Sequence, residues 1–110
     1  MKVSEIANRL DMKLLSGDPD REISGVYTCD LLSWVISHAA PGDLWVTVMN
    51  NINVIAVASL ADVGCVVIPE NVEVYDGLIE RADQKEVTLL STEMTAAEVI
   101  IKVNRLLEDK

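Results

Sequence analysis

Hydroxyl, carboxamide and carboxylate side chains recur directly after the strand-like segments of this 110-residue sequence. At the ends of the segments 22–28 and 44–48 stand Thr28, Asp30, Thr47, Asn50, Asn51 and Asn53. Such groups orient a bound ligand more readily than they perform acid–base chemistry. Three carboxamides around one helix start also exceed what a single helix cap needs. We therefore expect a ligand-binding surface here, with capping and turn formation as the alternative interpretation.

Polar residues also follow the later strand-like segments, at Glu70 and Asn71 and again at positions 91–93. Arg21 is the best single candidate for a charge-assisted contact with an anionic ligand. Helix N-termini at the strand ends would add attraction for an anion. The expected ligand is a nucleotide or another small anion.

No catalytic residue, resident cofactor or metal site is expected. His38 is the only histidine and stands near a predicted helix C-terminus, where a positive charge is favourable. Cys29 would need a nearby base to act as a nucleophile, and His38 is the only histidine available for that role. Cys65 lies in an apolar strand, and the two cysteines form no zinc-ligand pattern. Glycine-rich phosphate loops are absent. A cysteine-dependent enzyme using Cys29 or Asp30 is the remaining catalytic alternative.

The composition and charge of the chain exclude some classes of binding partner. The net charge of −9 argues against binding to nucleic acid or to an anionic membrane. The longest apolar stretch, residues 54–61, is too short to span a bilayer, and the N-terminus does not resemble a signal peptide. Two unpaired cysteines without a Cys-x-x-Cys motif favour reduced thiols. The sequence therefore predicts a cytoplasmic protein.

The strands and helices that position these side chains are predicted to alternate along the chain. Expected strands cover residues 13–15, 22–28, 44–48, 65–68 and 87–90, and expected helices cover residues 3–10, 30–38, 52–60, 76–84 and 96 onward. This alternation predicts an α/β fold, a single compact domain over residues 1–110 with a mainly parallel sheet flanked by helices.

Helix ends are marked by capping residues. Ser4 and Asp30 are expected N-caps of the first two helices, and Asn50 or Asn51 is expected to cap the third. Thr95 and Glu98 form a capping box for the last helix. Gly64 suits a helix C-terminus.

The chain resembles the DRTGG domain family across nearly its whole length. The resemblance rests on DREISGVY at 20–27, GDLWVT at 42–47, NNIN at 50–53 and IAVA at 55–58. The name-giving motif is altered, because Glu22 and a single Gly25 follow Asp20 and Arg21. Members of this family accompany CBS domains, pyrophosphatases, phosphotransacetylases and synthase-like domains. The resemblance implies regulation and self-association.

The first half also resembles the N-terminal domains of Mur ligases and of HPr kinase. The matching runs are SEIA at 4–7, LSGD at 15–18, ISGV at 23–26 and PGDLWV at 41–46. In the ligases this domain holds a uridine nucleotide through an Asp-Ser-Arg signature, which Thr28, Cys29 and Asp30 replace in this chain. This resemblance implies the shared fold.

Two non-catalytic functions remain. The first is a homodimeric regulatory domain that senses a small anion at the strand ends or acts on a partner enzyme such as a kinase, a synthase or a hydrogenase-related protein. The second is a pure interaction subunit, in which a face bearing Trp34, Trp45 or residues 52–60 packs against a second copy or a partner. Burial in the core is the simpler interpretation of those apolar residues.

Overall fold

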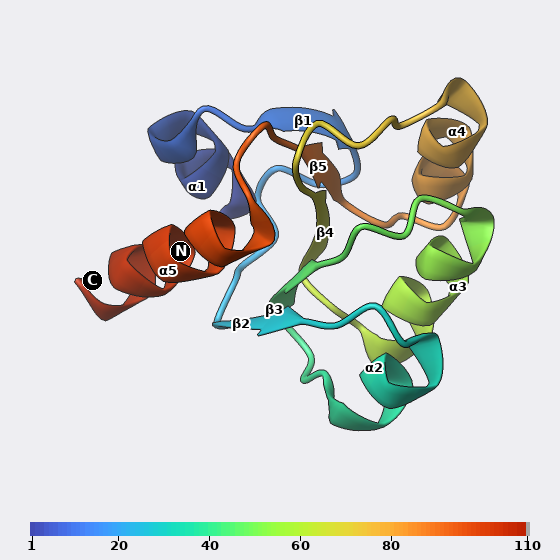
Figure 1. Ribbon diagram of the computed structural model, residues 1–110, viewed down its shortest axis with the longest axis horizontal. Helices are drawn as coiled ribbons and strands as arrows, with labels where there is room; N and C mark the ends of the chain where they lie inside the picture. Colours follow the sequence, from blue (N-terminus) through green and yellow to red (C-terminus); the bar gives the residue numbers. More distant parts are fainter. Residues whose placement is uncertain (110) are drawn as a thin grey trace.

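The computed structural model describes residues 1–109, and a five-stranded sheet lies at its centre (Figure 1). The strands are β1 (Lys13–Ser16), β2 (Gly25–Thr28), β3 (Asp43–Val46), β4 (Cys65–Ile68) and β5 (Leu89–Ser91). Their order in the sheet is β1-β5-β4-β3-β2. β2 to β5 are parallel, and only β1 runs antiparallel, at the edge beside β5. The expected α/β class with a mainly parallel sheet is confirmed.

Helices cover both faces of the sheet. They are α1 (Val3–Leu10), α2 (Leu32–His38), α3 (Ile52–Ala61), α4 (Asp76–Gln84) and α5 (Ala96–Glu108). The first and last helices cover one face, and the three helices between them cover the other (Figure 1). The chain therefore leaves β4 toward one face of the sheet and leaves β5 toward the opposite face.

Each face of the sheet has its own apolar core. Alternate residues of β4 serve both, since Val66 and Ile68 pack toward α2 to α4, whereas Cys65 and Val67 pack toward α1 and α5. All four are fully buried. A strand that is buried on both faces consists of a continuous run of apolar residues. This is why the sequence predicts β4 correctly.

Most expected elements are present, but several ends differ. The expected strand over 22–28 is hydrogen-bonded in the sheet only from Gly25, and the expected strand over 44–48 ends at Val46. The helix over 76–84 has the expected bounds. Asn51 caps α3, its side chain accepting a hydrogen bond from the Asn53 N–H.

Three terminus assignments are wrong. Lys2, not Ser4, precedes α1, because residue 2 is extended and pairs with Glu22, so the helix begins at Val3. Leu31 precedes α2, because the Asp30 carboxylate bonds to the β3–α3 loop instead. The α3 helix ends at Asp62, which adopts the left-handed conformation with φ 55°, two residues before Gly64.

Candidate functional site

Asp30 connects the loops that follow β2 and β3. Its Oδ1 atom accepts hydrogen bonds from the Thr47 hydroxyl at 2.8 Å and from the Val48 N–H at 3.0 Å. The Thr47 oxygen in turn accepts from the Met49 N–H at 3.2 Å. The side chain of Thr47 is almost completely buried, while Asp30 is exposed. The structure thus brings these two expected site residues together, in a contact that fixes the shape of both loops.

The other expected residues at this edge of the sheet also have intramolecular partners. Thr28 donates its hydroxyl to the Val46 carbonyl at 3.0 Å. Asn50 donates to the Glu73 carbonyl at 2.8 Å and so ties the β3–α3 loop to the segment before α4. Asn51 accepts from the Asn53 N–H at 3.0 Å. Turn and cap formation therefore accounts for most of the polar groups that the sequence singles out, while Asn53 itself is exposed.

Arg21 lies at the opposite end of the sheet from these residues. Its guanidinium donates to the backbone carbonyl and to the carboxylate of Asp62, at 3.0 and 3.2 Å. Asp62 ends α3 just before β4 begins, so this pair sits beside the amino ends of the parallel strands. Arg21 consequently does not share a site with Thr28, Asp30 or Thr47. A hollow of about 530 Å³ beside it is also lined by three acidic residues, Asp18, Asp83 and Glu86.

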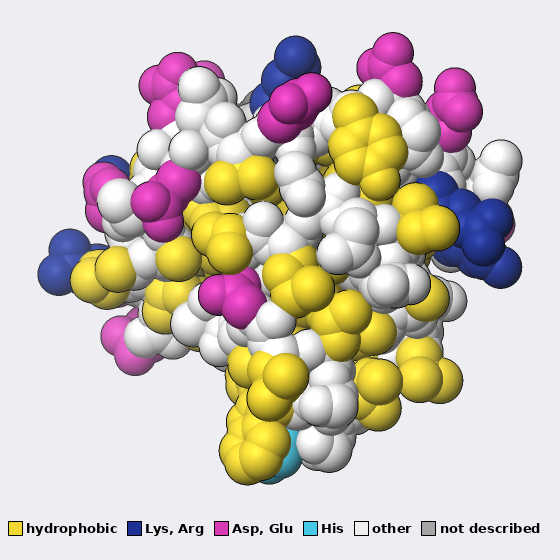
Figure 2. Space-filling model, turned by 45° about the vertical axis from the view of Figure 1, so that its right-hand side comes forward, with side chains coloured by type: hydrophobic (Ala, Val, Ile, Leu, Met, Phe, Trp, Pro, Cys, Tyr) yellow, Lys and Arg dark blue, Asp and Glu magenta, His cyan; other side chains and the backbone are white. Residues whose placement is uncertain are grey.

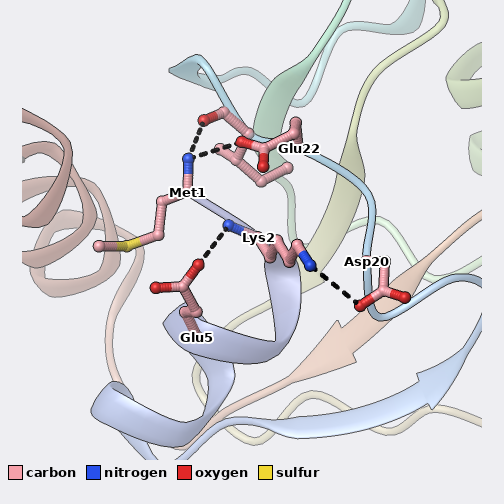
Figure 3. A network of polar contacts seen from close by, with 6 residues as sticks. Met1, Lys2, Glu5, Asp20 and Glu22 are labelled. Carbon is pink, nitrogen blue, oxygen red and sulfur yellow. Dashed lines mark hydrogen bonds and ion pairs between the residues drawn. The ribbon is translucent and has the colours of Figure 1, made fainter.

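The run at 20–22 holds the N-terminal segment in place (Figure 3). The Met1 ammonium contacts the Glu22 carboxylate at 2.8 Å, and Lys2 contacts Asp20 at 3.8 Å. The Val3 N–H donates to the Arg21 carbonyl at 3.0 Å. In this chain the side chains of Asp20 and Glu22 and the Arg21 carbonyl thus contact the segment that leads into α1.

Cys29 and His38 do not meet. The Cys29 sulfur forms hydrogen bonds with the backbone of Leu31, two residues further along the chain. The His38 Nδ1 atom lies 2.9 Å from the Trp34 carbonyl oxygen, and its ring stacks on Trp34 with centroids 3.9 Å apart. Desolvation raises the pKa of the neighbouring Tyr27 phenol, and the charge of Cys29 adds to that rise.

An uncharged surface covers α2 and α3. Between positions 31 and 61 the only charged residue is Asp43, although the chain holds 18 acidic and nine basic residues. We call the outer side of this segment the α2–α3 surface. Its exposed large apolar side chains are Leu31, Trp34, Ile36, Val48, Ile52 and Leu60. On the face where α2 to α4 come forward, yellow and white atoms dominate the central and lower part, and most charged side chains lie toward the margins (Figure 2).

The tryptophans differ in their surroundings. Trp45 is fully buried and donates its indole N–H to the Cys29 carbonyl at 3.0 Å, as the core interpretation requires. Trp34 is 52% exposed, and Leu60 at the end of α3 is 70% exposed. For these two residues the core interpretation is wrong. The missing charge over residues 31–61 is the sequence signal that would have indicated an exposed apolar surface.

No group of three or more histidine, cysteine, aspartate or glutamate residues within 1–109 is arranged to hold a metal ion. Nor does this part of the chain contain a helix of the length and hydropathy that crossing a bilayer requires.

The fold and its surfaces define the class of the protein. It is a small α/β domain with two helical layers and an uncharged helical surface. Within that class, the chain belongs to the DRTGG domain family, whose model matches residues 5–106. The first resemblance drawn from the sequence is thereby confirmed. No curated protein matches the chain.

A solved structure has the same fold. It is the crystal structure of the CBS and DRTGG domains of the regulatory region of Clostridium perfringens pyrophosphatase, complexed with its activator diadenosine tetraphosphate. The TM-score is 0.73 at 14% sequence identity, and the match covers 96% of this chain and 45% of that one. This chain therefore spans less than half the length of the structure that it matches.

Proposed function

We propose that this chain is a non-catalytic regulatory domain that acts through contact between protein chains, and that the α2–α3 surface is where a second copy of the chain binds. The observation that carries this proposal is the uncharged, apolar character of that surface. Exposed apolar patches on soluble domains mark interaction sites.

The charge of the chain favours a second copy on this surface. Two copies that each carry −9 repel one another wherever their acidic residues meet. A two-fold contact places the same patch of both copies together, so a patch without charge avoids that repulsion. Trp34, half exposed near the start of this segment, has the size and polarity of an interface anchor.

Family membership supports the regulatory role. The matching DRTGG domain of the pyrophosphatase lies in a region described as regulatory. By analogy, this chain would change the activity of a partner enzyme, and a kinase, a synthase or a hydrogenase-related protein is a candidate. The two cysteines, which are both free thiols, support the cytoplasm as the proposed compartment.

The test is the oligomeric state of the purified chain. Sedimentation velocity at low micromolar concentration should give a dimer for the natural sequence and a monomer for Trp34→Asp, because the substitution places a pair of carboxylates at the two-fold contact. Ile101→Asp is the matched control, since Ile101 is 51% exposed on α5, on the opposite face. It should leave the dimer intact. A monomeric natural chain, or a Trp34→Asp variant that still dimerises, would contradict the proposal.

A second candidate function is ligand sensing at the carboxyl ends of β2 and β3. Asn51 and Asn53 are exposed at the start of α3, where the positive end of the helix dipole attracts anions. With Thr28, Asp30, Thr47 and Asn50 they are the residues that would orient a nucleotide or another small anion.

A thermal-shift panel of nucleotides and phosphometabolites tests this candidate. We expect at least one of these compounds to stabilise the chain. Asn53→Ala should abolish this stabilisation, whereas Arg21→Ala should preserve it, because Arg21 lies at the other end of the sheet. No stabilisation at millimolar concentration would argue against it, and stabilisation lost only in Arg21→Ala would move the site to the opposite end.

A further inference from the structure

The loops after β4 and β5 are joined by hydrogen bonds from the Glu70 and Asn71 N–H groups to the Met94 and Thr92 carbonyls, and a crevice lies between these loops and β1. β4 and β5 are parallel neighbours, but the chain continues from β4 to α4 on one face and from β5 to α5 on the other. In open parallel sheets, ligands bind at the carboxyl edge where adjacent connections turn to opposite faces. Two hollows of about 390 and 310 Å³ lie at this place. In this sheet the general rule thus points to β4 and β5, not to β2 and β3.

Three polar side chains line both hollows: Lys13 of β1, Asn71 of the β4–α4 loop and Ser91 of β5. Lys13 and Ser91 are directly opposed in the antiparallel β1–β5 pair, so their Cβ atoms lie about 5 Å apart on the same face. Within residues 1–109 none of these three side chains has a hydrogen-bond or ion-pair partner, in contrast to Asp30, Thr47 and Asn50. Three convergent groups from three elements are therefore free to bind a ligand.

Carboxylates surround this single cation. Asp11 and Glu93 line the first hollow, and Glu73 and Asp76 line the second. In either hollow a multiply charged phosphate would meet one ammonium and two carboxylates, which is an unfavourable balance. A ligand that carries one negative and one positive group matches both parts of the lining.

We propose that the crevice between β1 and the β4 and β5 loops binds a small zwitterion of the α-amino acid type. Its carboxylate accepts hydrogen bonds from Lys13, Ser91 and Asn71, and its ammonium faces the acidic residues at the rim. The bond to Lys13 is charge-assisted and is therefore the strongest of these contacts. Either hollow has room for an amino-acid side chain.

Amide chemical shifts of the ¹⁵N-labelled full chain test the site. Each common amino acid is added singly at millimolar concentration, beside the matching carboxylic acid without an amino group, the matching amine and inorganic phosphate. We expect at least one amino acid to shift the amides of Lys13, Asn71 and Ser91 in a saturable way. The acid, the amine and phosphate should bind at least about tenfold more weakly, since each lacks one of the two charges.

Two variants and a control make the result specific to the crevice. Lys13→Met should weaken binding about tenfold and Ser91→Ala less, since the charged hydrogen bond is the stronger one. Lys102→Met, on the exposed side of α5, should leave the affinity unchanged. The proposal is overturned if no amino acid gives a saturable shift, if Lys13→Met binds as well as the natural chain, or if phosphate alone binds.

Discussion

The two thiols of this chain differ sharply in their environment. Cys65 is fully buried in β4, and burial raises the pKa of its thiol well above the ordinary value. Cys29 is half-buried at the end of β2. Because the thiolate is the reactive form, access and pKa both favour reaction at Cys29.

Alkylation of the native chain near neutral pH should therefore modify Cys29 first and leave Cys65 unmodified until the chain unfolds. Mass spectrometry of timed samples with and without denaturant measures this, and Cys29→Ser should make the native chain unreactive. Equal rates at the two cysteines would contradict the burial of Cys65. A reaction of Cys29 much faster than that of a free thiol would favour the cysteine-dependent enzyme instead.

Gly64 stands where the chain enters β4, against two other segments. A Cβ atom at this position would overlap the buried side chain of Ile23 and lie 3.0 Å from the Gly42 carbonyl oxygen. Gly64→Ala should therefore lower the free energy of unfolding by about 1–3 kcal/mol, as overpacking does. Urea denaturation measures the loss. Gly77→Ala in the exposed first turn of α4 is the control and should be neutral or slightly stabilising. Equal stability of the two variants would show that Ile23 and its neighbours move aside freely.

Among the helices, α5 has a reciprocal capping box at its start. The Glu98 N–H donates to the Thr95 hydroxyl and the Thr95 N–H donates to the Glu98 carboxylate, both at 3.1 Å. Thr95→Ala removes the hydroxyl and should cost about 1 kcal/mol of unfolding free energy. Thr95→Ser keeps the acceptor and is the matched control, expected to retain most of that stability. A loss as large in the serine variant would assign the effect to the methyl group rather than to the cap.

The same box predicts a pH dependence. Hydrogen bonds from the backbone and side chain of Thr95 lower the pKa of the Glu98 carboxyl in the folded chain. A lowered folded pKa means that this stabilisation is complete above the ordinary glutamate pKa and disappears as the pH falls through the lower folded value. The difference in unfolding free energy between the natural chain and Glu98→Ala should therefore be constant near neutral pH and shrink in acid. A difference that grows in acid would contradict this sign.

The elements that the sequence predicts best are those whose signals are local. The capping box marks the start of α5, and the apolar run 65–68 marks β4. The start of α2 was misplaced, since the Asp30 carboxylate bonds to Thr47 and Val48, two partners about 17 residues away in sequence. The preference of aspartate for helix caps does not indicate that its partner lies so far away in the sequence.

The packing of the helices on the two faces of the sheet determines which polar residues at the strand ends lie close together. The alternation of elements predicts parallel strands, but it does not say on which face each helix packs. Only the placement of α5 opposite α4 puts the crevice beside Asn71 and Ser91. In the same way, Arg21 follows a turn near Thr28 in sequence, yet the length of β2 carries the two residues to opposite ends of the sheet. Sequence reasoning therefore grouped Arg21 with residues that lie at the other end of the sheet.

The charge of the whole molecule predicts how self-association responds to salt. In the proposed dimer, two chains of −9 meet through the α2–α3 surface, so long-range repulsion opposes a short-range apolar contact. The Debye length falls from about 30 Å at 0.01 M salt to about 10 Å at 0.1 M, which screens the repulsion but not the contact. The dimer should therefore tighten severalfold over this range, as measured by sedimentation velocity in sodium chloride. Trp34→Asp should remain monomeric throughout. Weakening with salt would instead indicate an interface held by ion pairs, which the α2–α3 surface does not provide.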